Sequence, residues 1–130
     1  MQNTKADKAF ILIVDDEEDF LFTMKFWLIS KGYTVDTASS GKEGIAKVNE
    51  RKPDVILMDV MMPDMDGIAT LARIRASHND VPIIMITAFG LGPKTQQAKE
   101  YGVSGFFQKS EHFDKLAGLI EEAVRKRDIS

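Results

Sequence analysis

The sequence predicts a three-layer α/β fold, in which one parallel sheet lies between two layers of helices. Short apolar runs alternate with longer amphipathic stretches along the whole chain, which is the pattern of βαβ units. Three of these runs are almost continuously apolar, as expected for central parallel strands that helices cover on both faces. A length of 130 residues suits one domain with a single hydrophobic core.

The alternating pattern divides the chain into ten elements. Strands are predicted at Phe10–Val14, Thr34–Ala38, Val55–Met58, Pro82–Ile86 and Ser104–Phe107. Helices are predicted at 18–31, 41–50, 67–77, 93–101 and 112–127. Right-handed crossovers then give a flavodoxin-like (βα)5 fold, whose five-stranded sheet has the order 2-1-3-4-5. We expect the domain to span 10–127, between tails at 1–9 and 128–130.

Local signals mark several helix ends. Gly32 follows the first predicted helix and suits its C-terminal cap. The stretch "SGKE", from Ser40 to Glu43, matches a capping box. Pro93 suits the first position of the fourth helix, because its missing N–H has no partner there in any case.

Composition excludes several classes of function. The chain has no cysteine, and its two histidines, His78 and His112, lack the spacing of metal ligands. A net charge of -3 and a pI near 5.4 argue against nucleic-acid binding, and we interpret "RKR" at 125–127 as charges at a helix C-terminus. The apolar run 9–14 is too short for a membrane span, so we expect a cytoplasmic protein.

Charged and hydroxyl side chains follow four of the predicted strands. Asp15 and Asp16 follow the first strand, Asp59 the third, Thr87 the fourth and Lys109 the fifth. The carboxyl ends of parallel strands share one edge of the sheet, so these residues should lie together. Crowded carboxylates have raised pKa values or require a cation, and a site of oxygen ligands alone favours Mg²⁺.

A simpler explanation applies to the other acids in this segment. Glu17, Glu18 and Asp19 are expected to stabilise the start of the first helix, where negative charge is favourable. In "DVMMPDMDG", residues 59–67, only Asp59 is expected to react. Pro63, Asp64, Asp66 and Gly67 are expected to shape the loop and begin the third helix.

Four segments together carry a family resemblance: "ILIVDDEEDF", "PDVILMDVMMPDMDG", "PIIMITAFG" and "GFFQKS". In this order and spacing they resemble the receiver (response-regulator) domain of bacterial two-component signalling. The resemblance covers roughly 10–127. It implies that the chain is a signalling phosphoacceptor rather than an enzyme. Such a phosphoacceptor catalyses only its own phosphorylation and slow dephosphorylation.

The resemblance also implies a role for each residue at the strand ends. Asp59 would take a phosphoryl group from the phosphohistidine of a sensor histidine kinase or a histidine phosphotransfer protein. Asp16 would bind Mg²⁺ directly and Asp15 through water, with Asp59 and the backbone carbonyl of Met61 as further ligands; Mn²⁺ can substitute. Thr87 and Lys109 would each bind a phosphoryl oxygen.

The same resemblance implies a conformational switch. Thr87 would move toward the phosphoryl group while Phe106 rotates inward, which reshapes the surface of the fourth helix, fifth strand and fifth helix for an effector or output domain. Strand alternation places one of Phe106 and Phe107 in the core. Gly90 and Gly92 would give mobility to the loop between Thr87 and the fourth helix.

Two features depart from the family pattern. Ser110 follows Lys109 where the family commonly has proline after a cis bond; a non-proline cis bond costs about 2.5 to 4 kcal/mol, so we expect trans. The second departure is the first helix, whose core stripe is predicted to be Phe20, Met24, Trp27 and Leu28. Phe22, Phe26 and Ile29 fall on the opposite side and form a candidate partner or homodimer surface.

Three alternatives remain open from the sequence. A flavin-binding electron carrier shares the fold, although "DDEEDF" would repel a flavin phosphate. An aspartyl phosphatase needs a second acid to activate water, whereas Met61 stands two residues after Asp59. The chain could also be a receiver taken from a larger regulator or hybrid kinase.

Overall fold

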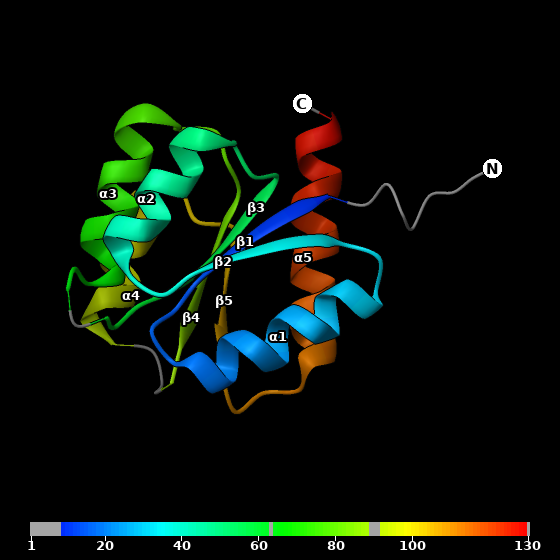
Figure 1. Ribbon diagram of the computed structural model, residues 1–130. Coiled ribbons are helices and arrows are strands. Elements are labelled where there is room, and N and C mark those ends of the chain that lie inside the picture. The colour runs from blue at the N-terminus through cyan, green and yellow to red at the C-terminus, as the bar shows by residue number, and fades with distance from the viewer. Residues whose placement is uncertain (1–8, 63, 89–91, 130) are drawn as a thin grey trace.

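A parallel five-stranded sheet lies at the centre of the computed structural model, which describes residues 9–62, 64–88 and 92–129 (Figure 1). Its strand order is β2-β1-β3-β4-β5, as predicted. The predicted N-terminal tail, apart from its last residue, lies outside the described residues, and so do Pro63, Gly90 and Ser130.

All ten predicted elements are present. The strands are β1 (Phe10–Val14), β2 (Thr34–Ala38), β3 (Val55–Asp59), β4 (Ile83–Thr87) and β5 (Gly105–Gln108). The helices are α1 (Glu18–Ser30), α2 (Gly41–Glu50), α3 (Gly67–Ser77), α4 (Pro93–Glu100) and α5 (Phe113–Ile129).

Three strands end one residue later than predicted, each at a polar side chain. In the ladder, Asp59 of β3 pairs with Ile86 of β4, and Thr87 of β4 pairs with Gln108 of β5. The prediction ended each strand with its apolar run, but a backbone ladder continues whatever side chain it carries. Helix α5 likewise extends two residues beyond the predicted end at 127.

The two faces of the sheet bury different side chains. Ile11, Ile13, Leu57, Ile86 and Phe107 point into the layer formed with α1 and α5. Their neighbours in the strands are buried in a second cluster on the other face: Leu12, Val14, Ile56, Met58, Ile83 and Met85. Figure 1 shows α2, α3 and α4 on that side of the sheet. This alternation explains the continuous apolar runs, because both faces of the central strands are covered.

The predicted helix caps are confirmed, except that the capping box of Ser40 and Glu43 is only half formed. Gly32 has φ 99° after α1, and its N–H donates to the Ile29 carbonyl. Ser40 Oγ accepts from the Glu43 N–H at 3.1 Å, while the Glu43 carboxylate accepts from the Ser39 N–H rather than from that of Ser40. Pro93 is the first residue of α4.

Helix α1 has one apolar face in the core and another in solvent. Met24 and Leu28 are fully buried and Phe20 and Trp27 half-buried, with Leu21 as an additional buried residue that the prediction did not include. Phe22, Phe26 and Ile29 are 65%, 56% and 45% exposed. The predicted orientation of α1 is therefore confirmed. No helix in the described part of the chain is long and apolar enough to cross a membrane.

Candidate functional site

The candidate site lies at the carboxyl edge of the sheet, where β1, β3, β4 and β5 end. The Val60 N–H donates to the Ile86 carbonyl at 2.8 Å, which fixes the chain just after Asp59. The Lys109 N–H donates to the Thr87 carbonyl at 2.8 Å, which fixes the start of the Lys109 loop in the same way. Backbone pairing therefore continues up to the residues that carry the predicted chemistry.

Three carboxylates meet at this edge, as predicted. Asp15, Asp16 and Asp59 each offer an oxygen, and these oxygens lie within 4.8 Å of one another. Asp15 is fully buried and Asp59 is 4% exposed, whereas Asp16 is exposed. The cluster could hold a metal ion, and its exposed member leaves it open to solvent.

Burial raises the pKa of both buried acids, Asp15 and Asp59, and repulsion from Asp15 adds to the rise at Asp59. Burial, followed by the negative charge of Asp15, raises the pKa of Asp59 to about 7. The Lys109 ammonium and a hydrogen bond from the Met61 backbone oppose this rise in the Asp59 pKa without cancelling it. Burial also raises the pKa of Asp15, against the attraction of the nearby Lys109 ammonium and a hydrogen bond from the Glu17 backbone. The site consequently favours any cation that offsets its charge.

The Lys109 ammonium approaches the acids unequally. Its Nζ lies 2.9 Å from Asp15 Oδ2 but 4.0 Å from Asp59 Oδ2, and it also contacts the Glu17 carboxylate. Nζ further lies 4.6 Å from the centre of the Phe20 ring, a cation–π contact. The side chain of Lys109 is 13% exposed, so these groups surround it. The peptide bond from Lys109 to Ser110 is trans, as expected.

One buried oxygen tests whether this chain suits a metal ion. Asp15 Oδ2 makes no hydrogen bond of acceptable geometry, although Lys109 Nζ is 2.9 Å away. An ammonium at that distance supplies charge but leaves a lone pair of the oxygen without a well-directed donor. Four acids at the edge, Asp15, Asp16, Glu17 and Asp59, face one ammonium from Lys109. The residues therefore fit a divalent cation of the oxygen-binding kind.

The predicted role of Glu17 is wrong in part. Glu17 occupies the N-cap position of α1, but its side chain makes no capping hydrogen bond. Its carboxylate binds Lys109 instead, across 92 residues of sequence. Glu18 and Asp19 lie in the first turn of α1 as expected. A glutamate is longer than the usual capping residues, and its reach is what brings it to Lys109.

The acids after Asp59 have structural roles, as predicted. Asp66 caps α3 by accepting from the Ala69 N–H at 2.8 Å. Asp64 accepts from the N–H groups of Gly41 and Lys42, at 3.2 and 3.3 Å, and so stabilises the start of α2. These hydrogen bonds hold both acids outside the cluster.

Gly67 permits the close approach of α3 to the site. A Cβ built on Gly67 would lie 2.1 Å from the carbonyl oxygen of Asp59 and 2.8 Å from Val60 Cα. The Gly67 N–H donates to the Val60 carbonyl at 2.7 Å. Only glycine fits this contact, which positions the backbone that follows Asp59.

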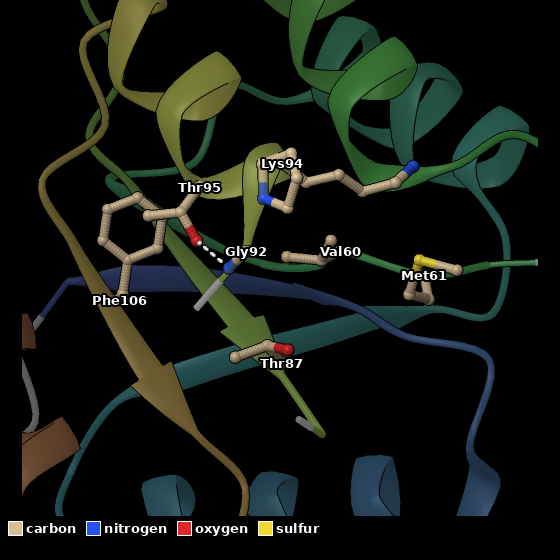
Figure 2. Close-up of a pocket in the computed structure, with 8 residues that line it drawn as sticks. Val60, Met61, Thr87, Gly92, Lys94, Thr95 and Phe106 are labelled. Atoms are coloured by element: carbon tan, nitrogen blue, oxygen red, sulfur yellow. Dashed lines mark hydrogen bonds between the residues drawn. The ribbon is translucent and has the colours of Figure 1, made fainter. Parts of the chain in front are cut away.

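A cavity of about 490 Å³ lies between β4, β5 and α4. Figure 2 shows Thr87 and Phe106 on its wall, together with Val60, Met61 and Thr95. Phe106 is half-buried while Phe107 is fully buried, so one of the two phenylalanines lies in the core, as strand alternation predicted. At the rim of the cavity, Lys94 Nζ binds Asp66 Oδ2 at 2.7 Å, an ion pair between α4 and the start of α3 that the sequence did not indicate.

Comparisons with known proteins agree with this arrangement. The chain is 36% identical to the transcriptional regulatory protein GlrR of Escherichia coli over 118 residues, which are 91% of this chain and 27% of GlrR. It is 38% identical over 109 residues to the alkaline phosphatase synthesis transcriptional regulatory protein PhoP of Bacillus subtilis, covering 84% of this chain and 37% of PhoP. The chain thus spans between a quarter and two fifths of these relatives.

Solved structures and a family model cover almost the whole domain. A CheY-like response regulator receiver domain protein from Methanospirillum hungatei superposes with a TM-score of 0.88 at 27% identity, over 92% of this chain and 95% of that one. The model of the response regulator receiver domain matches residues 11–121. This chain belongs to the response regulator receiver domain family.

Proposed function

We propose that this receiver domain accepts a phosphoryl group on Asp59 from the phosphohistidine of a sensor histidine kinase or a histidine phosphotransfer protein. The observation that carries the proposal is the position of Asp59. Its carboxylate is buried at the end of β3, beside two further acids and 4.0 Å from the Lys109 ammonium. Of the other two acids in this cluster, Asp16 is exposed and Asp15 already lies 2.9 Å from the Lys109 ammonium.

The transfer forms one bond and breaks one bond. An oxygen of the Asp59 carboxylate attacks phosphorus, the P–N bond of the phosphohistidine breaks, and the leaving imidazole takes up a proton. Asp59 must be deprotonated to attack, and a pKa of about 7 leaves a large protonated fraction at neutral pH in the absence of a cation. Lys109 lies close enough to offset charge that develops on the phosphoryl oxygens.

Mg²⁺ is the proposed cofactor, and Mn²⁺ can substitute for it. Its proposed ligands are Asp16, Asp59 and the Met61 carbonyl, with Asp15 acting chiefly through water. When bound, the ion would lower the pKa of Asp59 and offset the repulsion between carboxylate and phosphoryl group. The orphaned Oδ2 atom of Asp15 supports a cation at this position.

Thr87 and Phe106 are the proposed switch. Thr87 ends β4 at the site, and both residues line the same cavity (Figure 2). We infer that Thr87 moves to a phosphoryl oxygen and that Phe106 turns further into the cavity, since about 490 Å³ is ample for an aromatic ring. The face formed by α4, β5 and α5 would then change shape for an effector or output domain. GlrR and PhoP are transcriptional regulatory proteins, so a transcriptional output is the corresponding proposal for this chain.

The solvent-exposed face of α1 is a second proposed contact surface. Phe22 and Phe26 stack edge to face in solvent, with ring centres 4.7 Å apart. An exposed aromatic pair of this kind is typical of surfaces that bind another protein or a second copy of the chain. Sedimentation of the chain and of a Phe22→Ser, Phe26→Ser double variant, alone and with the phosphodonor protein, tests it; identical profiles would reject it.

Intact-mass spectrometry after incubation with acetyl phosphate and Mg²⁺ tests the phosphoacceptor proposal. We expect the mass of one added phosphoryl group in the wild-type chain and none in Asp59→Asn. Asp64→Asn is the matched control, because it makes the same change in the same loop, where Asp64 caps α2 and does not join the cluster. A gain that persists in Asp59→Asn, or no gain in the wild type, would refute the proposal.

A further inference from the structure

The Lys109 ammonium pairs with acids other than Asp59, the proposed phosphorylation site. Its ammonium contacts Glu17 and lies 2.9 Å from Asp15, whereas Asp59 is 4.0 Å away, beyond hydrogen-bonding distance. An ammonium has three N–H donors. Asp15 and Glu17 are in reach of these donors, and the Phe20 ring covers another side of the ammonium.

Glu17 differs from Asp15 in how easily it can leave Lys109. Asp15 is fully buried, and its Oδ1 accepts from the Glu17 N–H at 2.8 Å, so its carboxylate is fixed. The Glu17 side chain is 61% exposed, and it makes no capping hydrogen bond to α1. Its carboxylate could turn into water at little cost, whereas Asp15 would lose its charge partner inside the protein.

We propose that Glu17 is a positioning residue, which holds Lys109 away from Asp59 until an incoming phosphoryl group displaces the Glu17 carboxylate from the ammonium. The inference rests on the proposed phosphorylation of Asp59. A phosphoryl oxygen carries more negative charge than a carboxylate oxygen, so it is the stronger acceptor for the ammonium. The exposed Glu17 carboxylate, rather than the buried Asp15 carboxylate, is the one displaced from Lys109. Glu17 therefore slows phosphorylation in proportion to the strength of its contact with Lys109.

A pair of glutamates at the start of α1 makes a matched experiment possible. Glu17→Gln and Glu18→Gln each remove one negative charge, at adjacent exposed positions. Of the two, only Glu17 has an ion pair with Lys109 among the described residues. Glu17→Asp retains the charge but shortens the side chain, which separates loss of contact from loss of charge.

The first measurement is the initial rate of phosphorylation of the full chain by acetyl phosphate with Mg²⁺. In this reaction the P–O bond to acetate breaks as the bond to Asp59 forms, and acetate leaves with the electron pair. We expect Glu17→Gln and Glu17→Asp to react about two- to fivefold faster than wild type, the range that one exposed ion pair supplies. Glu18→Gln should differ from wild type by much less.

The second measurement needs no phosphoryl transfer. The Cε–Nζ correlation of Lys109 in the NMR spectrum of the metal-free chain should shift in Glu17→Gln and Glu17→Asp but not in Glu18→Gln. A purely structural role of Glu17 in α1 would leave this resonance in place.

The outcomes separate this inference from the proposed function. Equal rates for the two glutamine variants, a slower Glu17→Gln variant, or an unmoved Lys109 resonance would overturn the role of Glu17, while the wild type still gains its phosphoryl group. A wild-type chain that gains none refutes the proposed function, and the inference with it.

Discussion

The two edges of the sheet use charged residues in opposite ways. At the carboxyl edge, the buried acids Asp15 and Asp59 share one ammonium, and burial raises the pKa of each. One oxygen of Asp15 has no well-directed hydrogen-bond donor. This edge of the fold therefore leaves charge that the chain itself does not balance.

At the amino edge, charged side chains find partners within the chain. The Arg75 guanidinium donates to four backbone carbonyls that lie ahead of β4 and β5, those of His78, Val81, Tyr101 and Gly102. The Asp54 carboxylate accepts from the Phe10 N–H at 2.7 Å, at the start of β1. Lys52 and Asp80 pair at 2.8 Å on the surface, and this lowers the pKa of Asp80.

The difference lies in what completes each set of contacts. At the amino edge, Arg75, Asp54 and the Lys52–Asp80 pair have partners within the chain, so we expect their charges to add to stability. At the carboxyl edge, buried acids outnumber the one ammonium near them and an oxygen of Asp15 has no well-directed donor among the described residues, so these charges oppose folding and favour binding of a cation. Substitutions should therefore have opposite signs at the two edges, and three of them test this contrast.

Arg75→Met should have the largest effect. Methionine retains much of the apolar stem but leaves four carbonyls without their donor, and these carbonyls join α3 to the loops before β4 and β5. Hydrogen bonds from a charged donor contribute about 1.5 to 3 kcal/mol where they are buried, and several of these contacts are partly exposed. We expect a loss of about 2 to 3 kcal/mol in the free energy of unfolding, measured by urea denaturation.

Arg75→Lys provides the control for charge. A lysine ammonium has three donors on one nitrogen and cannot reach the carbonyls arranged around the edge of the planar guanidinium, so most of the loss should remain. Full recovery of stability in Arg75→Lys would show that charge alone, rather than the four directed hydrogen bonds, stabilises this edge.

The sequence predicts the carboxyl edge better than the amino edge. Asp15, Asp59, Thr87 and Lys109 each follow an apolar run, and parallel strands that end together bring such residues together. The partners of Arg75 are backbone carbonyls up to 27 residues away, and a carbonyl leaves no trace in the sequence. The ion pair of Asp66 with Lys94 is hidden for a related reason, because it depends on how α4 begins relative to α3.

Glu17 shows the limit of local reasoning at the predicted edge itself. Its position at a helix start favours a capping role, and only the three-dimensional arrangement places Lys109 within its reach. The fold was predictable to within one or two residues at each element end, since those ends depend on apolar runs and caps. Contacts between long side chains from distant segments were not.

Asp59→Asn should have the second-largest effect on stability, and it should stabilise the chain where Arg75→Met destabilises it. The Asp59 pKa is about 7 in the folded chain, against an ordinary value of 3.8. Between these pH values the folded chain binds more protons than the unfolded chain, so the stability of the wild type falls as pH rises from about 4 to about 7. Asparagine removes this penalty. Without metal at pH 8, we expect Asp59→Asn to be more stable by about 1 to 2 kcal/mol, less than the full shift implies because the site is open to water.

The pH dependence identifies the cause of that gain. The two proteins should approach equal stability below the ordinary carboxyl pKa of 3.8, and the advantage of Asp59→Asn should be complete just above pH 7. Adding Mg²⁺ should stabilise the wild type more than the variant, because the ion offsets the same charge. A constant difference at all pH values would assign the gain to packing and would break the contrast between the edges.

Asp80→Asn should have the smallest effect, although it makes the same chemical change as Asp59→Asn. Asp80 and Lys52 have side chains 68% and 47% exposed, so water and salt screen their attraction. The low pKa of Asp80, caused chiefly by its hydrogen bond from Lys52, means that this pair stabilises the fold above the ordinary carboxyl pKa and loses that contribution as pH falls. We expect a slight loss of stability at pH 7 in low salt, measured by thermal unfolding, which disappears at high salt. A gain in stability in Asp80→Asn would contradict the contrast directly, because it would mean that the amino edge also contains charge that the chain does not balance.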